Sequence, residues 1–169
     1  MGALWDNLEK TYLLYWAGGL GLAAGGTLLA WYRGWISVLK HPRVVVAIVY
    51  RGNKVVMVRR RGHAEPLTWQ FPAGHLKRPD DAAVRAIEEV KEETGIVCEF
   101  ESTLGERLHP DTKVYVHYVV CRYASGTLRN LDTKENEAVG WVGARTAGDR
   151  ITTDLDENVR QFLMKLGKN

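Results

Sequence analysis

The segment from Phe71 to Ile96 constrains the fold and chemistry of this chain more than any other. It places four glutamates within six positions, between the two glycines Gly74 and Gly95. Those glutamates are Glu88, Glu89, Glu92 and Glu93. Like charges three and four positions apart repel each other on a helix. We therefore expect either a solvated surface helix or a segment that binds a divalent cation.

The pattern predicts a helix that Asp80 or Asp81 caps and that Gly95 ends. At about 100° per residue, one side gathers the residues expected to face a sheet, which are Ala83, Ile87, Val90 and Thr94. The other side gathers the carboxylates of Glu89, Glu92 and Glu93. Converging carboxylates are hard oxygen ligands for Mg²⁺ or Mn²⁺. The chemistry that suits such a site is attack of a metal-bound water on a phosphoryl group.

The same segment resembles the Nudix signature, GX5EX7REUXEEXGU, in which U is apolar. The positions in register are Gly74, Glu89, Val90, Glu92, Glu93, Gly95 and Ile96. The resemblance covers about Arg43 to Lys168. It implies a Nudix-like α/β/α sandwich and a metal-dependent hydrolase that cleaves a nucleoside diphosphate linked to another moiety. It also implies metal binding by Glu89, Glu92, Glu93 and the carbonyl of Gly74, with Glu89 polarising the attacking water.

Two positions depart from the signature. Asp80 stands where the family has its first Glu, and Glu88 stands where it has an Arg. In Nudix enzymes that Arg is understood to orient a neighbouring catalytic glutamate. Arg85 lies one turn earlier and can pair with Glu88 or Glu89 at i+3 or i+4. We therefore predict that Arg85 joins the catalytic set by taking over the orienting role.

Residues near the signature are candidates for substrate binding. Arg59, Arg60 and Arg61 alternate along a strand end, so one or two of them can reach phosphates, with Arg59 and Arg61 favoured and a solvated strand end as the alternative. Trp69 and Phe71 can stack on a base, although core packing is the commoner role of such rings. His75 follows Gly74 directly and can approach a phosphate.

Two weaker candidates lie later in the chain. Glu137 can supply a further acid from a late loop, as members of the family often do. His109, in the sequence LHPDT, can contact substrate, but a turn residue is the simpler interpretation.

The rest of the region from 41 to 169 predicts one α/β domain. Two β-branched runs, 44–50 and 54–60, flank Gly52-Asn53 and predict a hairpin whose strands are covered on both faces. Further strands are expected within 96–108, 113–123 and 138–142. Thr153-Asp154 is expected to cap a final helix from about Leu155 to Leu166. Mixed strands with helices on either side make a three-layer sandwich.

Residues 1–40 predict a separate hydrophobic helix. No charge occurs among the 22 residues between Lys10 and Arg33, which would make a helix of about 33 Å against a hydrocarbon layer of about 30 Å. The basic residues Arg33, Lys40 and Arg43 follow it. We expect a single-pass anchor in the cell membrane with the catalytic domain facing the cytoplasm. A soluble packing or dimerising helix, which would leave the protein cytoplasmic, and a signal peptide are the alternatives.

The composition limits which molecules the chain is expected to bind. The net charge of +3 comes without a long basic stripe, so no nucleic-acid partner is expected. Cys98 and Cys121 lie far apart, which argues against a zinc site or a disulfide and favours buried thiols. A modified nucleoside triphosphate is the first choice of substrate, and a nucleotide sugar or ADP-ribose the second. A catalytically weak nucleotide-binding module at the membrane, which Glu88 favours, and a homodimer stay open.

Overall fold

The hairpin expected around Gly52 starts the sheet. β1 (Arg43–Arg51) and β2 (Lys54–Arg60) pair antiparallel, and Gly52 turns between them with φ of 58°. A left-handed backbone of this kind favours glycine. All of Val55 to Val58 are fully buried, which confirms that β2 is covered on both faces. The computed structural model describes residues 42–62, 69–77, 81–151 and 153–168.

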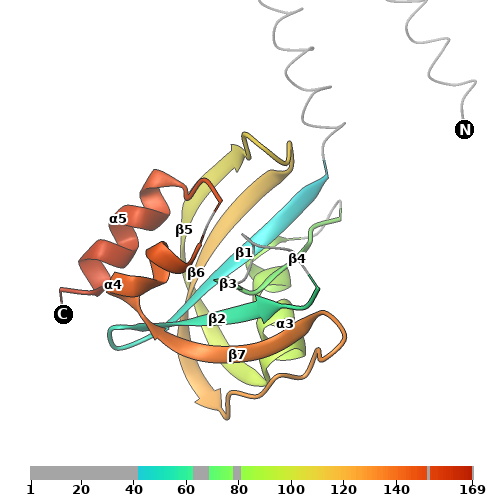
Figure 1. Cartoon of the computed structure of the whole chain (residues 1–169), viewed down its shortest axis with the longest axis vertical. Coiled ribbons are helices and arrows are strands. Elements are labelled where there is room, and N and C mark those ends of the chain that lie inside the picture. The colour runs from blue at the N-terminus through green and yellow to red at the C-terminus, as the bar shows by residue number, and fades with distance from the viewer. Residues whose placement is uncertain (1–41, 63–68, 78–80, 152, 169) are drawn as a thin grey trace, which may run out of the picture. The chain divides into compact units, whose positions relative to one another are not determined.

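The remaining strands extend this hairpin into a mixed sheet (Figure 1). β6 (Tyr115–Gly126) runs parallel to β1, and β5 (Ile96–Leu108) pairs antiparallel with β6. β4 (Ala73–His75) pairs with β1, whereas β3 (Trp69–Gln70) and β7 (Asn136–Gly143) pair with β2. Within the described residues the strand order is β3-β2-β1-β6-β5, with β4 and β7 off this path.

Helices cover both faces of the sheet (Figure 1). α3 (Ala82–Thr94) packs on one face, where Ala86 and Val90 join the buried side chains of β1 and β6. α4 (Ala144–Ala147) and α5 (Glu157–Leu166) pack on the other, with a 3₁₀ turn (Gly148–Arg150) between them. The structure therefore confirms a mixed sheet between helices.

Two expectations about the rest of the chain have different outcomes. Both cysteines are buried and free, as predicted. The predicted cap of the last helix is wrong, because Asp156 caps α5 and accepts a hydrogen bond from the Asn158 backbone N–H at 2.9 Å. The predicted helix within 1–40 lies outside the described residues. Among the residues that are described, no helix is long and apolar enough to cross a membrane.

Candidate active site

A cavity of about 1070 Å³ opens between α3, β4 and the neighbouring strands. Alternate residues of β1 and β6 give it apolar lining from Val44, Val46, Val116 and Tyr118. The first half of α3 adds polar and charged groups to its wall. The cavity therefore combines a carboxylate-rich end with an apolar floor.

The helix that carries the carboxylates begins and ends as the sequence predicts. The Asp81 carboxylate accepts hydrogen bonds from the backbone N–H groups of Ala83 at 2.7 Å and Val84 at 3.2 Å. Gly95 ends α3 with φ of 71°. Asp80, the other candidate for the cap, lies outside the described residues.

The side of α3 expected to face the sheet is largely confirmed. Val90 and Thr94 are fully buried, and Ile87 packs against the same core cluster, whereas Ala83 is half-buried.

The glutamates differ from the expectation. Glu89 and Glu93 are 8% and 6% exposed and line the cavity, whereas the Glu92 side chain is exposed. The acidic side of the helix is therefore divided between the cavity and the solvent.

Gly74 is required by the position of Glu89. A Cβ atom at Gly74 would lie 1.7 Å from Glu89 Oε1, far inside the closest approach of real atoms. The Glu89 carboxylate therefore occupies the volume that any side chain at position 74 would fill. This contact gives the first glycine of the signature a direct physical reason.

Arg85 joins three of the glutamates. Its Nη1 donates to Glu88 Oε2 at 3.1 Å, and its Nη2 lies 3.5 Å from Glu92 Oε2. Nη2 also donates to Glu89 Oε1. Burial lowers the pKa of Arg85, but the bond to Glu88 and the charges of Glu89 and Glu92 outweigh it and raise the pKa. Arg85 thus contacts Glu89 as the sequence predicts.

Burial makes the two inner glutamates hard to ionise. Burial, aided by the charge of Glu89, raises the pKa of Glu93 to about 8. The Glu93 Oε2 atom is buried and has no hydrogen-bond partner among the described residues. Burial also raises the pKa of Glu89, although the Arg85 charge opposes this. Two buried carboxyl groups side by side are more stable when a proton or a bound cation offsets their negative charge.

The carboxylates do not all converge. Among the described residues, no three Asp, Glu, His or Cys side chains lie close enough together to bind a metal ion. The Glu92 side chain is 62% exposed and pairs with Arg85. Glu89 and Glu93 do line the cavity beside Gly74. Since Mg²⁺ usually uses one or two carboxylates together with substrate phosphates, these residues fit such an ion.

The candidates for substrate binding divide into two groups. Phe71 and His75 line the cavity. Arg59, Arg61 and Trp69 do not, and each has another contact. Arg59 Nη2 lies 2.9 Å from Glu137, Arg61 Nε donates to the Thr133 carbonyl at 3.2 Å, and the Arg150 guanidinium lies 5.6 Å from the centre of the Trp69 ring.

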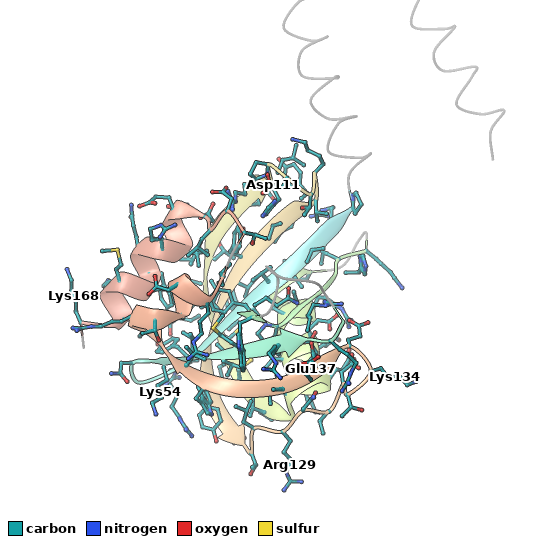
Figure 2. The ribbon with its side chains drawn as sticks, in the orientation of Figure 1. Lys54, Asp111, Arg129, Lys134, Glu137 and Lys168 are labelled. Carbon is teal, nitrogen blue, oxygen red and sulfur yellow. The ribbon has the colours of Figure 1, made fainter. Side chains whose placement is uncertain are left out.

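The cavity also has charged lining residues that the sequence did not single out, which are Lys77, Asp132 and Glu135. Arg60, the member of the three arginines that was not favoured, lines the cavity as well. Arg60 Nη2 donates to Glu135 at 2.6 Å. A β-bulge interrupts the pairing of β2 with β7 at this point. Arg59 pairs with Ala138 and Arg60 with Asn136, which leaves Glu137 as the extra residue on β7. Glu137, which is labelled on β7 in Figure 2, pairs with Arg59 on β2 and is not among the residues that line the cavity. Among these lining residues, only Asp132 could have been recognised from the sequence, as a turn residue. Its carboxylate accepts hydrogen bonds from two backbone N–H groups in the turn that follows it.

Two curated proteins are similar to this chain in sequence. A putative mutator protein MutT4 of Mycobacterium tuberculosis is 34% identical over 104 residues, which cover 56% of this chain and 39% of that protein. An ADP-ribose pyrophosphatase of Methanocaldococcus jannaschii is 28% identical over 80 residues, 47% of each chain. This chain thus spans less than half the length of both curated relatives.

The fold is also shared with solved structures. A Nudix hydrolase from Nitrosomonas europaea superposes with a TM-score of 0.63 at 16% identity, covering 74% of this chain and 71% of that one. The sequence profile of the NUDIX domain matches residues 40–166, which include both the sheet and the Gly74–Ile96 segment. The chain therefore belongs to the Nudix domain family.

Proposed function

We propose that this chain hydrolyses the diphosphate linkage of a nucleoside diphosphate derivative with the help of Mg²⁺ or Mn²⁺, and that a modified nucleoside triphosphate is its substrate. The observation that carries the proposal is the burial of Glu89 and Glu93 beside Gly74 at one end of a large cavity. Membership of the Nudix domain family supports the reaction class.

Glu89, Glu93, the Gly74 carbonyl and, after a change of side-chain conformation, Glu92 would hold the cation. A bound divalent cation neutralises diphosphate charge and activates a water molecule. The chain's own residues handle the proton. Glu89 is the candidate for accepting the proton of the attacking water, and the buried Glu93 is its neighbour at the cation.

Arg85 acts as a positioning residue in this proposal. Its guanidinium holds Glu89 from one turn away on the same helix and lies within 3.5 Å of Glu92. In this chain it stands in for the signature arginine, whose position Glu88 occupies. The Arg85–Glu88 pair then offsets the charge reversal rather than adding a repulsive group.

Other functions follow from particular observations. An ADP-ribose or nucleotide-sugar substrate is favoured by the similarity to an ADP-ribose pyrophosphatase. A nucleotide-binding module with weak catalysis is favoured by Glu88 and by the exposed Glu92. We also keep the proposal that residues 1–40 anchor the chain in the cell membrane with the domain facing the cytoplasm, which fractionation with and without residues 1–36 tests.

Hydrolysis is tested on the full chain with Mg²⁺ and a panel of nucleoside triphosphates, ADP-ribose and nucleotide sugars, by measuring phosphate and pyrophosphate release. We expect turnover on one class and its loss in Glu89→Gln and Glu93→Gln. Glu99→Gln is the matched control, because Glu99 is exposed on β5 and pairs with Arg122. Nucleotide binding without turnover on any member of the panel would instead support the binding module.

A further inference from the structure

The cavity extends well beyond the glutamates. β1 lies between β4, which carries Gly74, and β6, which carries Tyr118. Neighbouring strands are about 4.8 Å apart, so the backbones of β4 and β6 are separated by about 10 Å. The segments that follow β5 and precede α5 contribute His109, Asp154 and Leu155 to the lining. A ligand whose phosphates lie at the glutamates can therefore reach this second end.

The second end is apolar, with a few polar groups. Its lining includes Val46, Val114, Val116, Ile151 and Leu155, and all five belong to or pack against the core cluster beneath α4 and α5. Such a surface suits the faces of a planar heterocycle. A sugar would place several hydroxyl groups against it without partners, which costs free energy.

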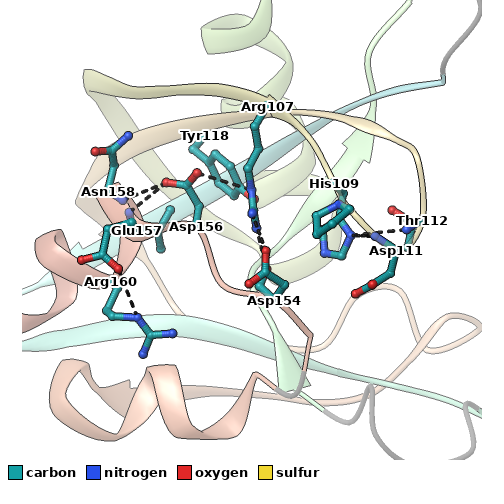
Figure 3. A network of polar contacts seen from close by, with 12 residues as sticks. Arg107, His109, Asp111, Thr112, Tyr118, Asp154, Asp156, Glu157, Asn158 and Arg160 are labelled. Carbon is teal, nitrogen blue, oxygen red and sulfur yellow. Dashed lines mark hydrogen bonds and ion pairs between the residues drawn. The ribbon is translucent and has the colours of Figure 1, made fainter.

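Two hydrogen-bond donors are directed by their neighbours (Figure 3). The Tyr118 hydroxyl accepts from Arg107 Nε at 3.3 Å, so its own proton is free to be donated. His109 Nδ1 accepts from the backbone N–H groups of Asp111 at 3.3 Å and Thr112 at 3.4 Å, which places the ring proton on Nε2. Among the described residues, neither donor has an acceptor. Tyr118 is 6% exposed and His109 8%.

Arg107 holds this end together (Figure 3). Its Nη1 donates to Asp154 Oδ2 at 2.6 Å, and its Nε lies 3.3 Å from Asp156 Oδ2. Asp156 is the N-cap of α5, so Arg107 joins β5 to the segment that forms one wall of the cavity. Asn158 adds a second tie by donating to the Leu104 carbonyl at 3.1 Å. Arg107 is thus a positioning residue for Tyr118 and Asp154.

We propose that this end of the cavity binds the base of a nucleotide, with the Tyr118 hydroxyl and His109 Nε2 donating hydrogen bonds to carbonyl oxygens or ring nitrogens of the heterocycle. The inference rests on the proposed function for the position of the phosphates. It assigns selectivity to residues outside the Gly74–Ile96 segment. The Asp154 carboxylate, whose side chain is 52% exposed and which binds Arg107 through Oδ2, can accept through Oδ1 from an amino or imino group of the same base.

The test is calorimetric titration of the full chain with Mg²⁺ and each nucleoside monophosphate, with ribose 5-phosphate and pyrophosphate as ligands that lack a base. We expect a preferred base, and about tenfold weaker binding of that nucleotide by Tyr118→Phe, with pyrophosphate affinity unchanged. Tyr115→Phe loses a hydroxyl on the same strand outside the cavity and is expected to bind as the parent does.

Two variants of His109 provide an independent measurement. His109→Asn keeps an acceptor near the Nδ1 position but removes the Nε2 donor, whereas His109→Gln keeps a donor near Nε2. We expect weaker nucleotide binding in the first and partial recovery in the second. Equal affinity for all monophosphates and ribose 5-phosphate, or unchanged binding by Tyr118→Phe and His109→Asn, would overturn the inference. Absence of hydrolysis with base-selective binding kept would overturn the proposed reaction and leave the base subsite standing.

Discussion

Two arginines in this domain each bind several carboxylates, and their surroundings differ. Arg85 on α3 contacts Glu88, Glu89 and Glu92, beside the buried Glu93. Arg107 on β5 contacts two carboxylates, those of Asp154 and Asp156. The first cluster therefore has the larger excess of carboxylates over arginine, and it includes the buried Glu89.

The pKa values follow this difference in charge. Burial raises the pKa values of Glu89 and Glu93, whereas the hydrogen bond from Arg107 lowers the pKa of Asp154. Raised carboxylate pKa values mean that the fold opposes ionisation, and a lowered value means that the fold favours it. The buried glutamates beside Arg85 therefore destabilise the fold when they are ionised without a cation, whereas the Arg107 cluster stabilises the fold.

Replacing Glu93 should have the largest effect. Glu93→Gln removes one of the two buried carboxylates that would hold the cation, and we expect turnover to fall by about a thousandfold. The same change should stabilise the metal-free protein at pH 9 by up to about 5 kcal/mol, because each tenfold change in proton affinity corresponds to about 1.4 kcal/mol. The folded pKa of about 8 exceeds the ordinary value of 4.5, so this cost is absent below pH 4.5 and complete above pH 8.

Urea unfolding of both proteins with EDTA at pH 5 and pH 9 measures this cost. The stability gain of Glu93→Gln should appear at pH 9 and shrink toward pH 5. Glu99→Gln serves as the control, because its carboxylate is exposed. A variant that is less stable than the parent at pH 9 would show that Glu93 belongs to a stabilising cluster.

Filling the space beside Glu89 should have the next largest effect. Gly74→Ala places a methyl group where the Glu89 carboxylate lies, and a displacement of about 1 Å in a catalytic group can lower the rate about a hundredfold. Gly140→Ala is the matched control on β7, since its Cβ would lie 3.8 Å from the Trp69 ring. The kcat values of the two variants are compared. Equal values would mean that catalysis does not require the Glu89 carboxylate to lie against residue 74.

Removing Arg85 tests the difference between the two clusters directly. Arg85→Ala should lower turnover about tenfold and move the acid limb of the pH–rate profile upward, since its charge lowers the pKa of Glu89. Adding Glu88→Arg restores the signature and should recover most of the loss. Arg160→Ala, which removes an exposed i, i+3 pair with Glu157, should leave the profile unchanged. Full turnover and unchanged metal affinity in Arg85→Ala would contradict the proposal that Arg85 positions Glu89.

Local patterns in the sequence were enough for the part of the site that one helix carries. The Asp81 cap, the Gly95 end and the Arg85 pairs all depend on residues close in sequence. The hairpin at Gly52 is local in the same way. These features could be predicted because helix and turn geometry fix them before any tertiary contact forms.

The parts that could not be predicted depend on distant residues. Strand alternation left open which of Arg59, Arg60 and Arg61 lines the cavity, and the structure places Arg60 there, next to a β-bulge in the pairing with β7. Arg107 binds Asp154 from 47 residues away, and the helix begins two residues later than expected, with Asp156 as its cap. The burial of Glu89 and Glu93 depends on how α3 rotates against β4, which the helical wheel does not contain.

Breaking the second cluster should affect stability more than an ordinary surface pair does. Arg107→Ala leaves Asp156, whose side chain is 15% exposed, without its cation, and we expect a loss of about 2 kcal/mol. Arg122→Ala removes an exposed pair with Glu99 on the same two strands and should cost less than about 1 kcal/mol. Chemical denaturation of the two variants makes the comparison. Equal losses would place the Arg107 network among ordinary surface pairs.

The smallest expected effect concerns a third charged cluster, which crosses β1, β6 and β5. His117 Nε2 accepts from Arg43 at 2.9 Å, and its Nδ1 lies 3.0 Å from Glu106. Burial lowers the pKa of His117, with Glu106 opposing and Arg43 adding to the shift. The folded chain therefore favours neutral His117. Above the unfolded pKa of about 6.5 the ring is neutral in both states, so His117 costs no stability there.

As the pH falls below that value, the unfolded chain takes up a proton that the folded chain binds less readily. Stability should thus decrease between pH 7.5 and pH 5.5, and His117→Gln should reduce this decrease by less than about 1 kcal/mol. Melting temperatures of both proteins at the two pH values measure the difference. A steeper loss in the variant would mean that Glu106 dominates and that protonated His117 stabilises the fold. This cluster would then resemble the ion-paired Arg107 network rather than the Arg85 site, where burial opposes charge.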